Sequence, residues 1–266
     1  MQELYSGPIL DFHTHPFICK EQNICFYKDT VAGTLAEYME DMERCGIVRY
    51  AGTPLQNEPS AERPEFRQIR LLNREALELR EATKGRYIPG FHIHPAYPKE
   101  SMEEIRLMER EGVHLVGELV PYWMGWSGYG YNAPEVYELF QVAGEAGMII
   151  SLHSGSPDEM DALLEACPHT VIVGAHPGEK NDFLRHVERM KKHPNYYLDL
   201  CGSAGVFRNG MIRKCLNEVG SHRLLYGSDY PVCTPGGTLG AVFFERLSEE
   251  ERSNILYKNA AALLRL

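Results

Sequence analysis

The strongest constraint on the fold is a regular alternation of short apolar segments with amphipathic ones along the 266 residues. Apolar runs of this length are typical of buried strands, and the amphipathic stretches between them are typical of surface helices. Strands are expected at 8–15, 47–51, 87–93, 113–119, 148–153, 170–175, 196–200 and 224–227. Eight alternating units predict parallel pairing and a closed (β/α)8 TIM barrel, one domain over 1–266.

The helices are expected between these strands and at the C-terminus. Their predicted ranges are 35–44, 64–84, 101–111, 134–146, 158–166, 181–192, 211–219 and 248–266. Ser101 followed by Glu104 indicates a capping box at the start of the third helix. No linker, repeat or low-complexity tract interrupts the pattern, which favours a single unit.

Composition excludes several classes of function. The formal net charge is −10 without a basic stripe, so nucleic acid is not expected as a partner. The seven cysteines show no CxxC pair, which favours a reduced, cytoplasmic location. No run approaches the roughly 20 apolar residues that a membrane helix needs. We expect a cytoplasmic protein that binds a small molecule, with a homo-oligomer as an open alternative.

A histidine pair marks the end of the first strand. His13 and His15 are two residues apart, so their side chains project from the same face of the strand, which Pro16 then ends. Two neutral imidazoles side by side form half of a metal site. Alone, this pair is equally consistent with ordinary histidines in a turn.

Further metal-competent side chains follow other strands. Glu118 ends the fourth strand, His153 the fifth, His176 the sixth and Asp229 the eighth. The carboxyl ends of barrel strands open on one face, so these residues and the histidine pair are expected to converge there. Imidazole and carboxylate ligands suit a divalent ion, with Zn²⁺ the first candidate and one or two ions possible.

The role of Glu118 stays open between a direct ligand, which we favour, a hydrogen-bond partner of an imidazole, and a structural carboxylate. Small residues two positions before three of these ligands (Ser151, Gly174 and Gly227) would leave space beneath the site. Tight packing or a strand bend explains them equally well. His92 and His94 are expected to line the pocket or to be hydrogen-bonded in the core.

The loop 121–131 is rich in glycine and aromatic residues and holds both tryptophans. Apolar density in a loop on the active face predicts a substrate wall or lid, for which we name Tyr122, Trp123 and Trp126. A subunit interface is the alternative. Arg208, in the loop after the seventh strand, is a candidate for binding an anionic substrate.

Three segments resemble the amidohydrolase superfamily, most closely its amidohydrolase 2 group of metal-dependent hydrolases and decarboxylases. They are Asp11-Phe12-His13-Thr14-His15, the Gly-Ser-Asp-Tyr-Pro signature at 227–231, and the Asn-Ala-Ala tail at 259–261. The resemblance covers nearly the whole chain. It implies that His13, His15, His153 and Asp229 hold a divalent metal, usually zinc. It also implies that His176 is catalytic or holds a second metal.

Glu118 departs from the group's decarboxylases and is similar to the bridging glutamate of the superfamily's metal-dependent deoxyribonucleases. The sequence therefore predicts a metal-dependent hydrolase that activates water against an ester, lactone or amide carbonyl, with Asp229 as general base. A decarboxylase and a two-metal phosphodiesterase or deoxyribonuclease are alternatives. A non-catalytic binding protein is a more distant one.

Overall fold

The computed structural model describes residues 5–25, 27, 29–60 and 62–266, and these form an eight-stranded parallel barrel. The strands pair in sequence order from β1 to β8. They are β1 Ile9–Thr14, β2 Ile47–Gly52, β3 Tyr87–Phe91, β4 Leu115–Leu119, β5 Ile149–His153, β6 Val171–Ala175, β7 Tyr196–Asp199 and β8 Leu224–Leu225. The predicted fold class is confirmed.

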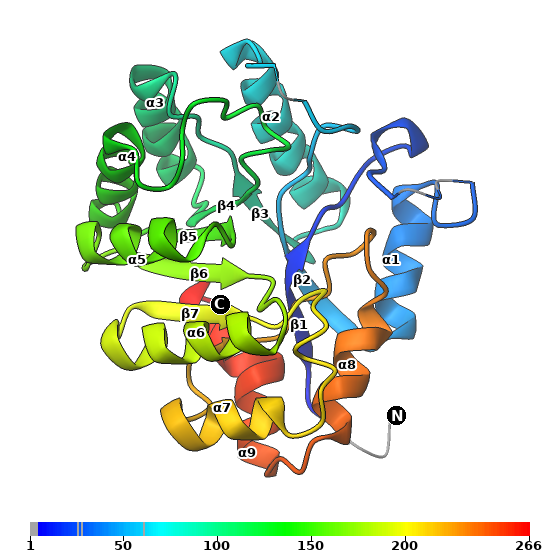
Figure 1. Ribbon diagram of the computed structural model, residues 1–266. Coiled ribbons are helices and arrows are strands. Elements are labelled where there is room, and N and C mark those ends of the chain that lie inside the picture. Colours follow the sequence, from blue (N-terminus) through cyan, green and yellow to red (C-terminus); the bar gives the residue numbers. More distant parts are fainter. Residues whose placement is uncertain (1–4, 26, 28, 61) are drawn as a thin grey trace.

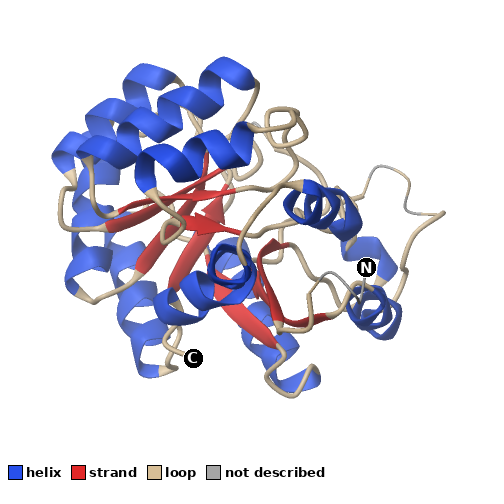
Figure 2. Ribbon diagram, turned by 90° about the horizontal axis from the view of Figure 1, so that it is seen from below, coloured by secondary structure: helices blue, strands red, loops and turns tan. Residues whose placement is uncertain are grey.

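The helices form the outer layer around the strands (Figures 1 and 2). They are α1 Leu35–Arg44, α2 Phe66–Ala82, α3 Pro98–Arg110, α4 Pro134–Glu145, α5 Pro157–Ala166, α6 Lys180–Lys192, α7 Met211–Val219, α8 Pro235–Phe244, α9 Glu249–Ser253 and α10 Asn259–Leu263. A 3₁₀ turn, Lys20–Gln22, follows β1, and a π-helical turn, Asn254–Lys258, joins α9 to α10. Within the described residues, no helix is long and apolar enough to cross a bilayer.

The barrel closes through the residues that follow the two-residue strand β8. The Phe12 amide donates to the Tyr226 carbonyl over 2.9 Å, and the Asp229 amide donates to the His13 carbonyl over 2.8 Å. Backbone pairing thus continues beyond Leu224–Leu225 and places Asp229 directly beside His13. The seam of the barrel lies at the predicted site.

Side chains from six strands meet in one buried cluster, which is possible only inside the barrel. Its strand members are Leu10, Phe12, Ala51, Leu115, Ile149, Val173 and Leu225. Ala260, Ala261 and Leu264 belong to the same cluster, and α10 packs on β1 and β8. The Asn-Ala tail is linked to β8 through Asn259. Its side-chain amide donates to the carbonyls of Ser221 and Leu224 and fixes the start of β8.

Three details of the prediction are wrong. Helix α8 was not expected, because Pro235–Phe244 contains three glycines and no charged residue and so lacks an amphipathic pattern. The predicted helix over 248–266 is divided into α9, the π-helical turn and α10. The capping box at Ser101 is also wrong: α3 begins at Pro98, and the buried Ser101 hydroxyl donates instead to the His94 carbonyl.

Candidate active site

Glu118, at the end of β4, lies between two pairs of histidines. Its Oε2 atom is 3.1 Å from His13 Nε2 and 3.3 Å from His15 Nε2. Its Oε1 atom is 3.2 Å from His153 Nδ1 and 3.3 Å from His176 Nε2. Each carboxylate oxygen therefore faces its own pair of imidazoles, and residues from β1, β4, β5 and the loop after β6 meet at one point.

Asp229 completes the first of these groups. Its Oδ1 atom is 3.6 Å from His13 Nε2 and 3.4 Å from His15 Nε2. His176 and Asp229 have φ angles of 59° and 64°, a left-handed conformation that is rare for residues other than glycine. Such residues cluster at functional sites, where the surrounding structure holds them in place.

The structure brings all six predicted metal ligands together in two groups of three. The potential ligand atoms of His13, His15 and Asp229 lie within 4.8 Å of one another, and so do those of Glu118, His153 and His176. Two atoms that are each about 2.1 Å from one ion lie roughly 3.0–3.5 Å apart at octahedral or tetrahedral angles. The distances around Glu118 and Asp229 match this spacing.

Hydrogen bonds on the far side of two imidazoles fix which nitrogen faces the site. His15 Nδ1 lies 2.9 Å from the Thr53 carbonyl oxygen, and His13 Nδ1 lies 2.6 Å from Asp199 Oδ2. Both partners accept, so each Nδ1 carries the hydrogen and each Nε2 of the neutral ring presents a lone pair. The lone pairs of the two imidazoles face carboxylate oxygens. These electron-rich atoms repel one another unless a positive charge lies between them. The donor set therefore fits a divalent cation.

The pKa values of His13 and Glu118 also indicate that the site stabilises positive charge. Burial alone would lower the pKa of His13, but the carboxylates of Glu118 and Asp199 raise it well above the ordinary value. Burial alone would raise the pKa of Glu118, but the histidines, above all His13, hold it well below the ordinary value. The buried cluster thus stabilises a cation between its imidazoles and its carboxylates.

Asp199, the last residue of β7, is a site residue that the sequence analysis missed. It is fully buried, and its second oxygen, Oδ1, accepts the Cys201 amide over 3.0 Å. A Cβ atom on Gly227 would lie 2.1 Å from Asp199 Oδ1, so the glycine leaves the space in which this carboxylate supports His13. A signal was available, because Asp199 ends an apolar strand just as the predicted ligands do.

Cys201 lies behind the imidazoles and away from the cavity above them. Its Sγ atom is 3.1 Å from His13 Nδ1 and 3.4 Å from His176 Nδ1, and the residue is fully buried. Burial raises the pKa of its thiol above the ordinary value. A protonated thiol without access to substrate is no nucleophile.

A cavity of about 160 Å³ lies above the two groups of ligands. Tyr122 and Trp123 line it, as predicted for the aromatic loop. The Tyr122 ring stands edge-on to His153 with ring centroids 5.2 Å apart. The Trp123 indole nitrogen donates to the Gln56 carbonyl over 2.7 Å, so this wall is anchored to the loop after β2.

Two predicted substrate-binding residues do not line this cavity. Trp126 is buried behind it and packs edge-on against His94 and Tyr131. Arg208 is exposed, and its guanidinium pairs with Glu179 over 3.1 Å. The geometry gives neither residue a contact with the site, and their proposed role in binding substrate gains no support.

His92 and His94 are core residues, the second of the alternatives expected for them. His92 Nε2 donates to the Pro54 carbonyl over 2.8 Å, next to the Thr53 carbonyl that holds His15. Burial lowers the pKa of both His92 and His94 to about 4, so both rings are neutral near pH 7. His92 supports the loop after β2, whereas the His94 ring lies against the loop after β4, with Nε2 3.3 Å from the Gly125 carbonyl oxygen.

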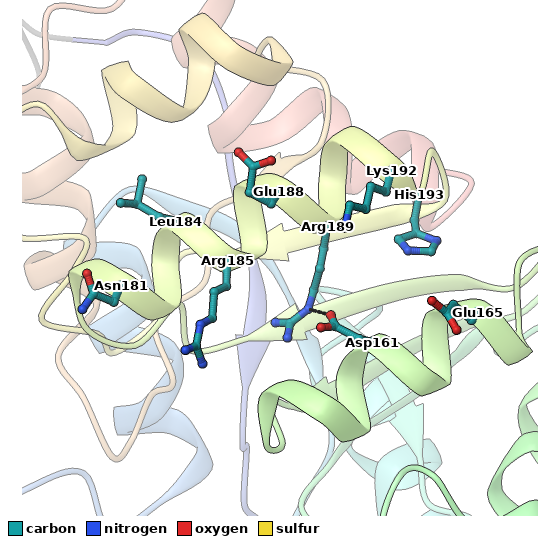
Figure 3. Close-up of a pocket in the computed structure, with 9 residues that line it drawn as sticks. All are labelled: Asp161, Glu165, Asn181, Leu184, Arg185, Glu188, Arg189, Lys192 and His193. Carbon is teal, nitrogen blue, oxygen red and sulfur yellow. Dashed lines mark hydrogen bonds and ion pairs between the residues drawn. The ribbon is translucent and has the colours of Figure 1, made fainter.

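A larger hollow of about 320 Å³ lies on the outer surface between α5 and α6 (Figure 3). Its side chains carry both signs of charge, and Arg189 of α6 reaches Asp161 of α5 over 2.6 Å. The hollow lies among outer helices rather than at the strand ends, where barrel enzymes carry their chemistry. Its ion pair joins two neighbouring helices.

The chain is similar to known proteins in sequence family and in fold. A protein-family model described as "Amidohydrolase" matches residues 10–266. No curated protein matches the sequence. The fold is similar to a TIM-barrel protein from Bordetella bronchiseptica, with a TM-score of 0.75, 18% identity, and coverage of 97% of this chain and 99% of that one.

Two further solved structures with the same fold are decarboxylases. The 2,6-dihydroxybenzoate decarboxylase from Rhizobium aligns with a TM-score of 0.74 and 14% identity over 97% of this chain and 98% of that one. A dihydroxybenzoic acid decarboxylase from Polaromonas, solved with bound manganese and an inhibitor, aligns with a TM-score of 0.72 and 15% identity over 98% and 97%.

Proposed function

The chain belongs to the amidohydrolase family of metal-dependent enzymes, and we propose that it is a two-metal hydrolase. Its substrate would be a small molecule with an ester, lactone or amide carbonyl. The observation that carries this proposal is the position of Glu118, whose two oxygens face two separate groups of ligands. A carboxylate that presents one oxygen to each of two ligand groups can bind two ions that share one site.

The first ion would be held by His13, His15 and Asp229, and the second by His153 and His176, with Glu118 shared between them. Bound divalent ions lower the pKa of a coordinated water towards about 7 and polarise a carbonyl oxygen. Imidazole ligands suit zinc and its first-row neighbours. Zinc remains our first candidate, and the manganese in the Polaromonas structure makes manganese the second.

The chain's own residues provide the proton transfer and the orientation. Asp229 directs Oδ1 towards the imidazoles, and the Cys233 Sγ atom lies 3.9 Å from its Oδ2. This second oxygen is placed to accept the proton of the attacking water and to return it to the leaving group. Asp199 and the Thr53 carbonyl keep His13 and His15 in the ligating tautomer.

Glu118→Gln tests the bridge. The wild-type protein should bind two ions per chain at saturating metal, and the variant one or fewer, because a carboxamide has a single acceptor oxygen and cannot serve both groups. Elemental analysis and a metal titration measure this. Glu179→Gln, an exposed carboxylate on the same face that pairs with Arg208, is the matched control and should keep both ions. A wild-type stoichiometry of one, unchanged in Glu118→Gln, would refute the two-metal hydrolase.

Decarboxylation is the second candidate, favoured by the likeness to two decarboxylases over nearly the whole chain. It needs no attacking water, so release of carbon dioxide from an aromatic carboxylate, without ester or amide turnover, would establish it. A phosphodiesterase is less well supported. Among the described residues that line the cavity there is no lysine or arginine to neutralise phosphate charge.

A further inference from the structure

The walls of the active-site cavity differ in chemistry from its floor. The floor is polar and consists of the candidate ligands His15, Glu118, His153, His176 and Asp229. The walls are Ile24, Leu55, Val120, Tyr122, Trp123 and Val232. None of these six wall residues is charged; their polar side-chain groups are the Tyr122 hydroxyl and the Trp123 indole N–H, and the latter donates to the Gln56 carbonyl.

The walls come from four separate loops, two of which are hydrogen-bonded to one another. Ile24 follows β1, Leu55 follows β2 and Val232 follows β8, whereas Trp123 belongs to the loop after β4. The Ser60 amide donates to the Trp123 carbonyl over 3.1 Å, which joins the loops after β2 and β4. A cavity built in this way is preformed, so its shape and polarity select the ligand without a large rearrangement.

The size of the cavity limits the body of a substrate. Its volume of about 160 Å³ is close to the roughly 150 Å³ of an apolar cavity that holds one benzene molecule. Aliphatic walls strengthen binding by about fourfold for each methylene that they remove from water. They give no partner to a charged group, which would lose its hydration there without compensation.

From these observations we propose that the site accepts small substrates whose reacting carbonyl faces the floor and whose remaining body is uncharged and apolar. The part of the body that the cavity encloses is about one six-membered ring or a chain of similar volume. This inference rests on the proposed hydrolase function for the identity of the reacting group. Substrates with a second carboxylate or an amine at the far end are disfavoured.

Binding and turnover are measured separately on the metal-loaded enzyme. Calorimetry compares hexanohydroxamate with the two hydroxamates of equal chain length that end in a carboxylate or an amine. Hydrolysis compares ethyl hexanoate with the corresponding ω-carboxylate and ω-amino esters. We expect the neutral compound to bind at least about tenfold more tightly and to be preferred by a similar factor in kcat/KM.

A wall variant makes the test specific to the cavity. Val232→Lys adds a cation at the half-buried rim and should shift the preference towards the ω-carboxylate compounds, with the metal content unchanged. Leu71→Lys, on the exposed surface of α2, is the matched control and should keep the wild-type preference.

The outcomes separate the two proposals. Equal or tighter binding of the ω-carboxylate or ω-amino hydroxamate by the wild-type enzyme would overturn this inference and leave the hydrolase function standing. Absence of ester and amide turnover, together with a retained preference for the neutral hydroxamate, would overturn the hydrolase function and support the cavity's selectivity.

Discussion

Asp199→Asn is the most informative single substitution, because it changes one buried atom that no substrate touches. The wild-type carboxylate accepts two hydrogen bonds, one on each oxygen. His13 Nδ1 lies 2.6 Å from Oδ2, and the Cys201 amide lies 3.0 Å from Oδ1. Asparagine has the same shape but offers one acceptor and one donor, so it satisfies only one of these partners.

The size of the effect on stability or metal binding depends on which of the two hydrogen-bond partners is lost. If the carboxamide oxygen keeps His13, its NH₂ group faces the Cys201 amide, and an unpaired buried donor costs about 1–3 kcal/mol of stability. If the oxygen keeps Cys201, His13 must accept at Nδ1 and carry its hydrogen on Nε2, the atom that would bind metal. Loss of such a supporting carboxylate typically weakens metal binding by about 10–100-fold, or roughly 1.4–2.7 kcal/mol.

Competition with a chromophoric chelator measures the dissociation constant of the more tightly bound ion in wild type and variant. Denaturant unfolding of the metal-free proteins measures the stability term separately. Asp161→Asn is the matched control, because Asp161 pairs with Arg189 on the outer helices and has no contact with the site. If Asp199→Asn binds metal within about twofold of wild type and its metal-free form is also as stable as wild type, the tautomer argument and the proposed role of Asp199 in holding His13 are wrong.

Four further outcomes are expected. Asp229→Asn at matched metal occupancy should lower kcat by about 10²–10⁴-fold, and a change of only a few-fold would assign the base elsewhere. Trp123→Ala should raise KM with metal retained, whereas Trp126→Ala should mainly lower the melting temperature, because only the first residue lines the cavity. Burial lowers the pKa of His186 to about 3. Between about pH 6.5 and 3 the unfolded chain therefore binds a proton at this residue that the folded chain does not. The free energy of unfolding falls as the pH falls through this range. His186→Gln should therefore reduce the slope of unfolding free energy against pH near pH 5 by about 1.4 kcal/mol per unit, measured by denaturant titration. Asn259→Ala should cost about 1–3 kcal/mol of stability without changing metal content, because two buried carbonyls lose their donor.

Local pattern was sufficient for most elements of the barrel. The eight strands are where their apolar runs predicted them, because a strand buried on both faces must be apolar along its length. Helix α8 was missed because its ten residues contain no charged side chain to mark a solvent face. Ser101 was misassigned as a cap because Pro98 is a better first residue for the helix, and the Ser101 hydroxyl found a backbone partner at His94.

The candidate ligands could be found from the sequence because they lie at strand ends, and the pattern of apolar runs predicts where the strands end. His13, His15, Glu118, His153 and Asp229 each follow an apolar run, and a parallel barrel brings all such positions to one rim. The sequence by itself thus determined the fold class, the family resemblance and the set of candidate ligands.

Only the tertiary structure decided which contacts each of these residues makes. That each oxygen of Glu118 faces a different pair of histidines, and that Asp199 holds His13, depends on distances between strands far apart in the chain. Trp123 and Trp126 are three residues apart in one loop, yet only Trp123 lines the cavity. Residue spacing along a strand fixes which side chains share a face, but which atoms meet across a closed barrel depends on the register and closure of all eight strands.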